Sequence, residues 1–234
     1  MKGENFVNDG KQLVYHEQEN GKRIQWHTLS VPRGGEYKLV LADGTRVWLN
    51  AASELMYPDH FSADQRKVVL KGEAYFEVTK DVKRPFSVVL GDMEVKVLGT
   101  SFNVSAYPGV KRQTTLIEGQ VAVNWHRQQV VIRPGQQAAE TDEGLRVASV
   151  NVMNYVGWKE HRFVYENKLL GEVLEDLERW YDVEVFVMHD EIRNLHLTAN
   201  LPRYENMDKV LEIIEYAACV KFEVKGRTVV VRRD

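Results

Sequence analysis

Two glutamates four residues apart, Glu73 and Glu77, form the pair in this sequence best suited to acid–base chemistry. On a β-strand this spacing places both carboxyl groups on one face, as a general acid and its partner base require. Strand alternation also explains the pair without catalysis, because it directs one set of side chains inward (Ala74, Phe76, Val78) and the other into water (Glu73, Tyr75, Glu77). We therefore interpret the two acids as the solvent-facing side of a half-buried strand.

Ser101 and Cys219 are the candidate nucleophiles. Ser101 lies in LGTSF, which lacks the GxSxG spacing of a nucleophile elbow, so we interpret it as a turn residue. Cys219 is the only cysteine, and it stands beside Val220 at the end of a helical apolar stripe. We expect it to be a small buried side chain, and no disulfide can form within the chain.

Metal ligation finds no support either. The seven histidines form no HxxxH pair and no cluster with the cysteine. The densest polar group, His189 to Glu191, falls between two expected strands, where turn residues belong. The sequence therefore predicts no catalytic residue, no metal site and no cofactor site, and an enzyme is the least supported class.

Composition indicates a globular chain without the net positive charge that is typical of nucleic-acid-binding proteins. The 234 residues are 44% hydrophobic, and 31 basic residues oppose 34 acidic ones for a net charge of -3. No general attraction to nucleic acid or anionic lipid follows from this balance. No apolar run approaches the roughly 18 residues of a membrane-spanning helix, and the first nine residues are too polar for a signal peptide.

Residues 12–150 show short β-rich runs broken by glycine and Asp/Asn turns, which predicts an all-β region, either a sandwich or solenoid-like. Asp43-Gly44 suits a tight hairpin turn between two such runs. A loose internal repeat is visible in two pairs of segments: Tyr37–Asn50 with Phe86–Gly99, and Val68–Val78 with Thr114–Trp125. True duplication and chance β patterning both remain open.

After residue 151, helical periodicity appears twice, 37 positions apart (207 − 170 = 37), with a strand expected before and after each helix. The repeated apolar positions are Leu170, Val173, Leu174, Leu177 and Tyr181, then Met207, Val210, Leu211, Ile214 and Ala218. Asn167 and Asn206 are expected to cap the helices. Each helix should cover a small sheet, with four acids in water: Glu172, Glu175, Asp176 and Glu178.

We therefore expect a mainly β chain with a C-terminal α+β domain. The predicted divisions are a tether and first strand over residues 1–30, an all-β domain over 31–153, and a small βαβ-βαββ domain over 154–234. Charge supports the second boundary, because residues from 151 onward carry 12 basic and 16 acidic side chains (12 − 16 = −4).

Ordered motifs across nearly the whole chain resemble FecR-like anti-sigma factors. The motifs are PRGGEY (Pro32–Tyr37), DGTRVWLNA (Asp43–Ala51), LKGEAYFEV (Leu70–Val78), RPFSV (Arg84–Val88), VLGTSFNVSAY (Val97–Tyr107), LIEGQVAV (Leu116–Val123), RPGQQA (Arg133–Ala138), Trp158, FVYEN (Phe163–Asn167) and RWYDVEV (Arg179–Val185). The second region is similar to the small secretin-and-TonB-short-N-terminal fold.

The resemblance implies a periplasmic sensor of a single-pass inner-membrane protein. Such a sensor is contacted by the signalling domain of a ligand-loaded TonB-dependent outer-membrane transporter. Site proteases then cleave the anti-sigma protein, and an extracytoplasmic-function sigma factor is released. The cytoplasmic and membrane segments of the family are missing from this sequence, so we expect it to be the periplasmic portion.

A strand of the second domain is the expected docking element, because an exposed sheet edge can accept another strand. Alternation assigns partner contact to His196, Thr198 and Asn200, although an ordinary solvated strand face explains them equally well. Two other functions remain open. One is a carbohydrate-binding module, whose aromatic platform would need the dispersed Trp48, Tyr107 and Trp125, and the other is a secretin-associated structural module.

Overall fold

The computed structural model describes residues 2–3, 6–8, 12–15, 23–203 and 206–234. The chain divides into two compact units, each described here by itself. The all-β unit comprises Met1–Pro32 and Glu36–Val152, and the C-terminal unit comprises Arg33–Gly35 and Met153–Asp234. The tether expected over residues 1–30 lies partly outside the described residues. None of the described helices is long and apolar enough to cross a membrane.

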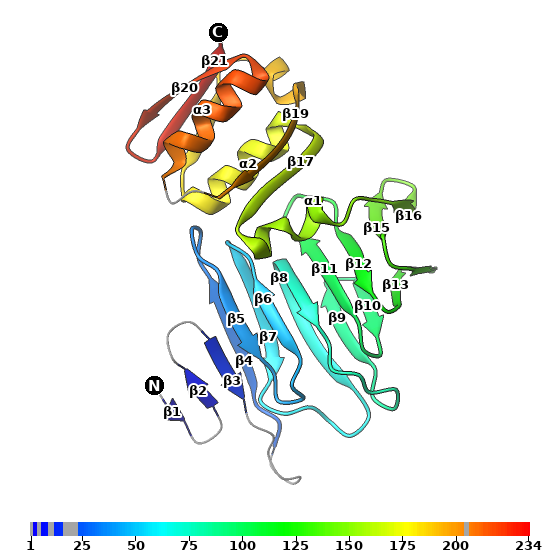
Figure 1. Ribbon diagram of the computed structural model, residues 1–234. Coiled ribbons are helices and arrows are strands. Elements are labelled where there is room, and N and C mark those ends of the chain that lie inside the picture. Colours follow the sequence, from blue (N-terminus) through cyan, green and yellow to red (C-terminus); the bar gives the residue numbers. More distant parts are fainter. Residues whose placement is uncertain (1, 4–5, 9–11, 16–22, 204–205) are drawn as a thin grey trace. The chain divides into compact units, whose positions relative to one another are not determined.

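The all-β unit consists of two sheet layers that share one strand (Figure 1). One layer runs β1-β2-β3-β5-β6-β8-β11-β12-β15-β16, and the other runs β4-β7-β8-β9-β10-β13-β14. The strands are β1 (Lys2–Gly3), β2 (Phe6–Asn8), β3 (Gln12–Tyr15), β4 (Trp26–Val31), β5 (Tyr37–Val40), β6 (Arg46–Leu49), β7 (Ser53–Pro58), β8 (Arg66–Glu77), β9 (Phe86–Leu90), β10 (Met93–Val97), β11 (Ser101–Ala106), β12 (Gln113–Glu118), β13 (Val121–Trp125), β14 (Gln128–Ile132), β15 (Gln136–Thr141) and β16 (Gly144–Ser149). Both layers contribute to a single apolar core, as in a sandwich.

Strand β8 changes layer at Gly72. Its first half pairs with β7 and β9, and its second half pairs with β6 and β11. Gly72 has a φ of +91°, and an added Cβ would lie 2.4 Å from the Ser53 hydroxyl oxygen. Gly119, with a φ of +93°, likewise separates β12 in one layer from β13 in the other. Gly72 and Gly119 thus belong to the two paired segments of the internal repeat, Val68–Val78 and Thr114–Trp125, and at each of them the chain passes from one layer to the other. Only glycine adopts this backbone conformation without strain.

The predicted Asp43-Gly44 turn joins β5 to β6, and its Asp43 is one partner of a buried ion pair. Arg66 is fully buried, and its Nη1 donates to the Asp43 carboxylate at 2.7 Å and to the Thr79 carbonyl at 2.7 Å. Asp43 also accepts from the Thr45 amide and hydroxyl. The turn residue therefore neutralises a charge inside the core, beyond its conformational role.

The C-terminal unit contains both predicted helices between two small sheets (Figure 1). Strands β17 (Arg162–Leu169) and β19 (His196–Pro202) form one sheet, and β18 (Glu184–Val187), β21 (Thr228–Arg233) and β20 (Val220–Lys225) form the other. The helices are α2 (Leu170–Tyr181) and α3 (Met207–Ala218), with α1 (Met153–Val156) and two 3-10 turns, η1 (Gly157–Glu160) and η2 (Asp190–Asn194). Each helix contacts strands of both sheets: α2 contacts β17, β18 and β19, and α3 contacts β19 and β20.

The 37-residue repeat extends to the ends of the helices. Both α2 and α3 end in a residue with left-handed backbone, Asp182 and Cys219, at φ values of 53° and 52°. Asn206 caps α3 as predicted, because its side chain accepts from the Asp208 amide. The prediction that Asn167 caps α2 is wrong: α2 starts after Leu169, and Asn167 lies in a bulge of β17 with a φ of 51°.

Two further expectations are corrected. Cys219 is exposed rather than buried, because it occupies the left-handed position beyond the last turn of α3. Of the four acids expected in water, Asp176 accepts from Lys168 and Arg179, each at 2.7 Å. Burial alone would raise the pKa of the Asp176 carboxyl, but these two cations outweigh burial and lower it.

Candidate partner-binding site

The glutamate pair of β8 forms no acid–base site. Glu73 accepts from the Asn50 side-chain amide at 2.7 Å and from the Asn103 amide at 2.8 Å. Glu77 pairs with Arg46 at 2.6 Å. The two carboxylates therefore have separate partners, and Tyr75 between them is buried rather than exposed to water. These contacts hold adjacent strands together, and neither acid shares a proton with the other.

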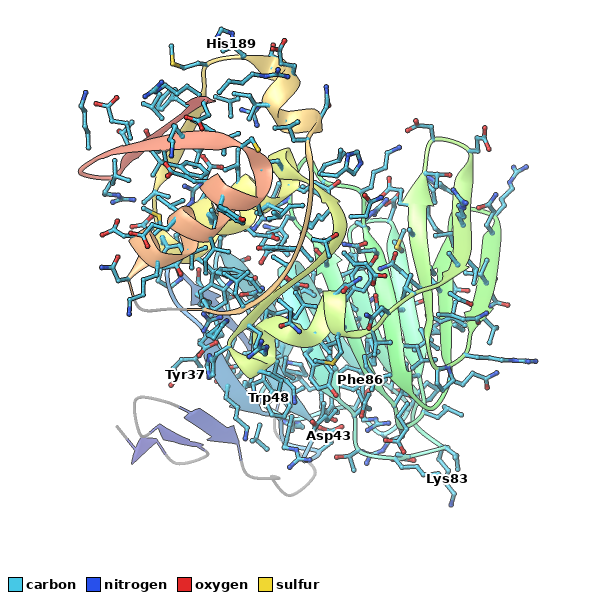
Figure 2. All side chains as sticks on the ribbon, turned by 45° about the horizontal axis from the view of Figure 1, so that its top comes forward. Tyr37, Asp43, Trp48, Lys83, Phe86 and His189 are labelled. Carbon is cyan, nitrogen blue, oxygen red and sulfur yellow. The ribbon has the colours of Figure 1, made fainter. Side chains whose placement is uncertain are left out.

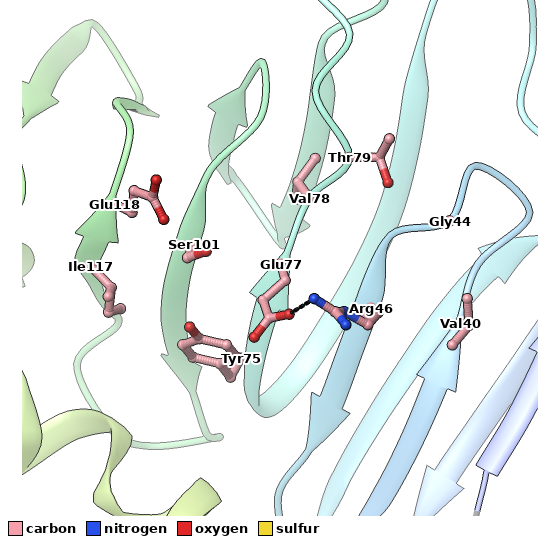
Figure 3. Close-up of a pocket in the computed structure, with 10 residues that line it drawn as sticks. All are labelled: Val40, Gly44, Arg46, Tyr75, Glu77, Val78, Thr79, Ser101, Ile117 and Glu118. Carbon is pink, nitrogen blue, oxygen red and sulfur yellow. Dashed lines mark ion pairs between the residues drawn. The ribbon is translucent and has the colours of Figure 1, made fainter.

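An open pocket of about 610 Å³ lies over the row that contains Glu77 (Figure 3). Strand register places Arg46, Glu77 and Ser101 side by side on β6, β8 and β11, and Glu118 of β12 is opposite Ser101. No histidine or cysteine lines the pocket, and the acids beside Ser101 are Glu118 and Glu77, of which Glu77 pairs with Arg46. Among the described residues, no group of three potential metal ligands occurs anywhere.

The polar group from His189 to Glu191 lies where a turn was expected, at the start of η2. All three residues are exposed, and Glu191 pairs with Arg233 at 3.5 Å. The three aromatic residues considered as a sugar platform are not gathered. Trp48 of β6 contacts Tyr75, the buried Tyr107 donates to the Ala51 carbonyl, and Trp125 of β13 donates to Asp92.

Strand β19 carries the three residues predicted to bind a partner. His196, Thr198 and Asn200 are exposed, whereas Leu197 and Leu201 are buried in the core of the C-terminal unit. The alternation expected from the sequence is therefore present. The structure also engages two of the three side chains: the Asn167 amide donates to Thr198 Oγ1 at 2.9 Å, and Arg162 Nε donates to Asn200 Oδ1 at 2.9 Å.

The backbone of the same three residues faces the outer edge of β19. The Arg203 amide donates to the His161 carbonyl, and the Leu170 amide donates to the Leu195 carbonyl, so odd-numbered residues of this strand bond to β17. Even-numbered residues then direct their amides and carbonyls away from β17. Pro202, which has no amide to donate, fits this register. Within the described part of the C-terminal unit, the edge formed by His196, Thr198 and Asn200 pairs with no other strand.

The two outer edges of the three-stranded sheet are protected. The Glu178 carboxylate of α2 accepts from the Val185 amide on β18, and the Glu215 carboxylate of α3 accepts from the Phe222 amide on β20. Both contacts join residues seven apart, at equivalent positions of the repeat. Carboxylates on edge amides hinder the addition of a strand. Sequence reasoning missed these contacts, although a glutamate repeated at the end of each helix was visible.

Two family models match the chain. The FecR protein model matches residues 27–122, and the model of the FecR C-terminal region matches residues 162–231. This chain therefore belongs to the FecR family, and it is a FecR-like anti-sigma factor.

Solved structures agree with this assignment. Two crystal structures of a proposed anti-sigma factor from Parabacteroides distasonis ATCC 8503, at 1.65 and 2.50 Å resolution, are each 26% identical to this chain with a TM-score of 0.83. The matches cover 89% and 90% of this chain, and 99% and 100% of the crystallised chains. The mostly β fold with a small C-terminal α+β region is thus that of an anti-sigma factor. None of the curated proteins matches this sequence significantly.

Proposed function

We propose that this chain is the periplasmic sensor of an anti-sigma factor, which reads the ligand-loaded state of a TonB-dependent outer-membrane transporter by protein contact. Regulated proteolysis by site proteases relays the signal to an extracytoplasmic-function sigma factor, which a cytoplasmic segment outside this sequence holds. The role is regulatory rather than enzymatic. Membership of the FecR family carries the proposal. Members are typically anchored in a membrane, which suits a relay between two compartments.

The domain expected over residues 154–234 is the docking part, and the edge of β19 is its contact strand. Main-chain hydrogen bonds from an added strand supply affinity whatever its sequence, and exposed side chains on either side select the partner. His196 and Asn200 supply both kinds of contact, because their amides point outward and their side chains are exposed. Thr198 and Asn200 are held in place by β17, so the edge is ordered before a partner arrives.

The double substitution His196→Pro/Asn200→Pro tests this strand. Proline removes two outward amides and leaves the hydrogen bonds between β17 and β19 in place, so the circular dichroism spectrum should stay native. Binding is measured by surface plasmon resonance against the signalling domain of the TonB-dependent transporter encoded nearest to this chain's gene. The expected result is a loss of binding of at least about a hundredfold, as for two lost hydrogen bonds and a blocked edge.

Val224→Pro is the matched control. The Phe222 amide points away from β21 toward Glu215, so the Val224 amide two residues on also points outward, on an edge with no proposed partner. This variant should bind like the wild type. Unchanged binding of the His196→Pro/Asn200→Pro variant would remove β19 from the interface. A wild-type chain that binds no such signalling domain would overturn the sensing function itself.

A further inference from the structure

One end of the all-β unit gathers exposed apolar side chains on separate segments. Phe86, the first residue of β9, pairs with Arg66 at the start of β8 and with Val97 at the end of β10. The loop that precedes β9 and the turn that follows β10 therefore project from the same end. Val82 in that loop is 65% exposed, and Leu98 in that turn is 45% exposed.

Trp26 belongs to the same end. It is the first residue of β4 and pairs with Pro58, the last residue of β7, whose strand runs antiparallel to β8. Trp26 is 48% exposed, which is high for a tryptophan, because tryptophan has the largest apolar side chain. Tryptophan is enriched at membrane–water interfaces, where its ring meets lipid and its N–H meets water. Three apolar side chains on different segments thus share one end without forming a groove.

Lysines accompany these apolar residues. Lys80 and Lys83 flank Val82 in the loop before β9, and Lys67 is the second residue of β8. All three are exposed, and none forms an ion pair with another residue in the described part of the chain. Figure 2 labels Lys83 at the tip of its loop.

The loop is ordered, so the lysines are presented in a defined place. The Asp81 amide donates to the Leu98 carbonyl at 2.8 Å, which ties the loop to the turn after β10. The Asp81 carboxylate accepts from Arg84 Nε at 2.8 Å and from the Lys83 amide at 3.0 Å, so its charge is already neutralised. Two other exposed acids lie nearby: Asp64 in the bend before β8 and Glu118 at the end of β12. The net positive charge of this end is therefore small.

We propose that this end of the all-β unit, defined by Trp26, Val82 and Leu98 with Lys67, Lys80 and Lys83, rests on the surface of an anionic phospholipid bilayer. The lysines meet lipid phosphates, and the three apolar side chains enter the interfacial layer between head groups and acyl chains. The near-neutral net charge of the whole chain does not oppose this contact, because attraction to a charged surface acts within about a Debye length. The contact orients the unit on the membrane and is independent of partner docking through β19.

Co-sedimentation with vesicles tests the proposal. The whole chain is mixed at low salt with vesicles of phosphatidylglycerol and phosphatidylethanolamine, or with vesicles of phosphatidylcholine alone. Binding is expected to the anionic vesicles only, and 0.5 M NaCl should release most of it. Because one lysine near an anionic surface contributes about a fivefold factor, Lys80→Ser/Lys83→Ser should lower the partition coefficient by roughly thirtyfold. Val82→Ser/Leu98→Ser should lower it by about tenfold through lost apolar insertion.

Phe186→Ser/Arg232→Ser is the matched control, because it removes an exposed apolar residue and an exposed cation from the C-terminal unit. This variant should bind vesicles like the wild type. Equal binding to neutral and anionic vesicles, no binding by the wild type at low salt, or wild-type binding by both loop variants would each overturn the proposal. Retention on immobilised polyglutamate without binding to anionic vesicles would assign the surface to an acidic polypeptide and overturn it as well.

Discussion

Asp43→Asn should destabilise the all-β unit severely, because it leaves the Arg66 guanidinium buried without a counter-charge. The Arg66 side chain is 0% exposed, and the Asp43 side chain is 5% exposed. Asparagine keeps the size of the residue and one oxygen for the Thr45 amide, but its amide nitrogen cannot accept. The substitution therefore removes the charge together with the hydrogen bonds that the second carboxylate oxygen accepts from Arg66 and the Thr45 hydroxyl. Removal of one partner of a buried pair costs about 3–5 kcal/mol.

We expect the lower end of that range, about 3 kcal/mol, because two carbonyls still accept from Arg66. Its Nε donates to the Arg84 carbonyl at 2.9 Å, and its Nη1 donates to the Thr79 carbonyl. For a chain of this size, 3 kcal/mol corresponds to a fall in Tm of roughly 10 °C. Urea unfolding followed by circular dichroism gives the free energy, and an unchanged m-value would show that the denatured state is unaffected.

The control is Asp142→Asn, which removes the partner of Lys111 in a surface ion pair. The Asp142 side chain is 92% exposed, so this loss should stay below about 0.5 kcal/mol. The double variant Asp43→Asn/Arg66→Met should recover most of the stability, because it removes the stranded charge as well. If Asp43→Asn costs no more than Asp142→Asn, the buried pair contributes nothing and the reasoning fails.

Three further outcomes follow from the structure. Gly72→Ala should cost at least about 3 kcal/mol, whereas Gly109→Ala, with a φ of +78° but open space around it, should cost only about 1 kcal/mol in urea titrations. Hydrogen bonds from Arg112 and Trp125 lower the pKa of Asp92 to about 2, so its contribution to stability is present above pH 3.8 and is lost as the pH falls toward 2. Tm should therefore fall more steeply between pH 4 and pH 2 in the wild type than in Asp92→Asn, and parallel curves would contradict this. Cys219 should react with Ellman's reagent in the folded protein, and a thiol that reacts only in denaturant would contradict its exposure.

Local periodicity made the C-terminal elements predictable. The apolar positions of α2 and α3 recur every three to four residues, and the helices start at the first residue of each predicted stripe, Leu170 and Met207. Such a pattern can be recognised from residues close together in the sequence, because the residues on one face of a helix recur every three to four positions and that face packs against the core. Asn206 was predictable for the same reason, because capping acts within three residues.

The incorrect predictions involve long-range contacts. Asn167 has the chemistry of a cap, but pairing of β17 with β19 places it in a bulge opposite Thr198. Asparagine tolerates left-handed backbone in either role, so the residue type could not distinguish them. Cys219 has apolar neighbours, yet its place beyond α3 makes it exposed. Asp176 was expected in water, but the side chain of Lys168, eight residues earlier, donates a hydrogen bond to its carboxylate.

The candidate docking strand was found only in part. Alternation along β19 was enough to identify His196, Thr198 and Asn200 as exposed side chains. Whether their backbone amides point toward β17 or away from it depends on which residues of β17 lie opposite them. A shift of the strand pairing by one residue would reverse that direction. The protected edges of the other sheet depend likewise on helix carboxylates that reach strand amides.

The sequence by itself determined the elements, the turn at Asp43-Gly44, the duplicated helix-containing motif and the family, because these depend on residue types at short spacing. Only the tertiary structure decided how the strands pair into two layers and which sheet edges stay open. It also decided that Arg66 and Asp176 have ion-pair partners and that the exposed Lys67, Lys80 and Lys83 have none among the described residues. The physical reason is that strand pairing and ion pairing join residues far apart in the chain, and many alternative pairings satisfy the same local pattern.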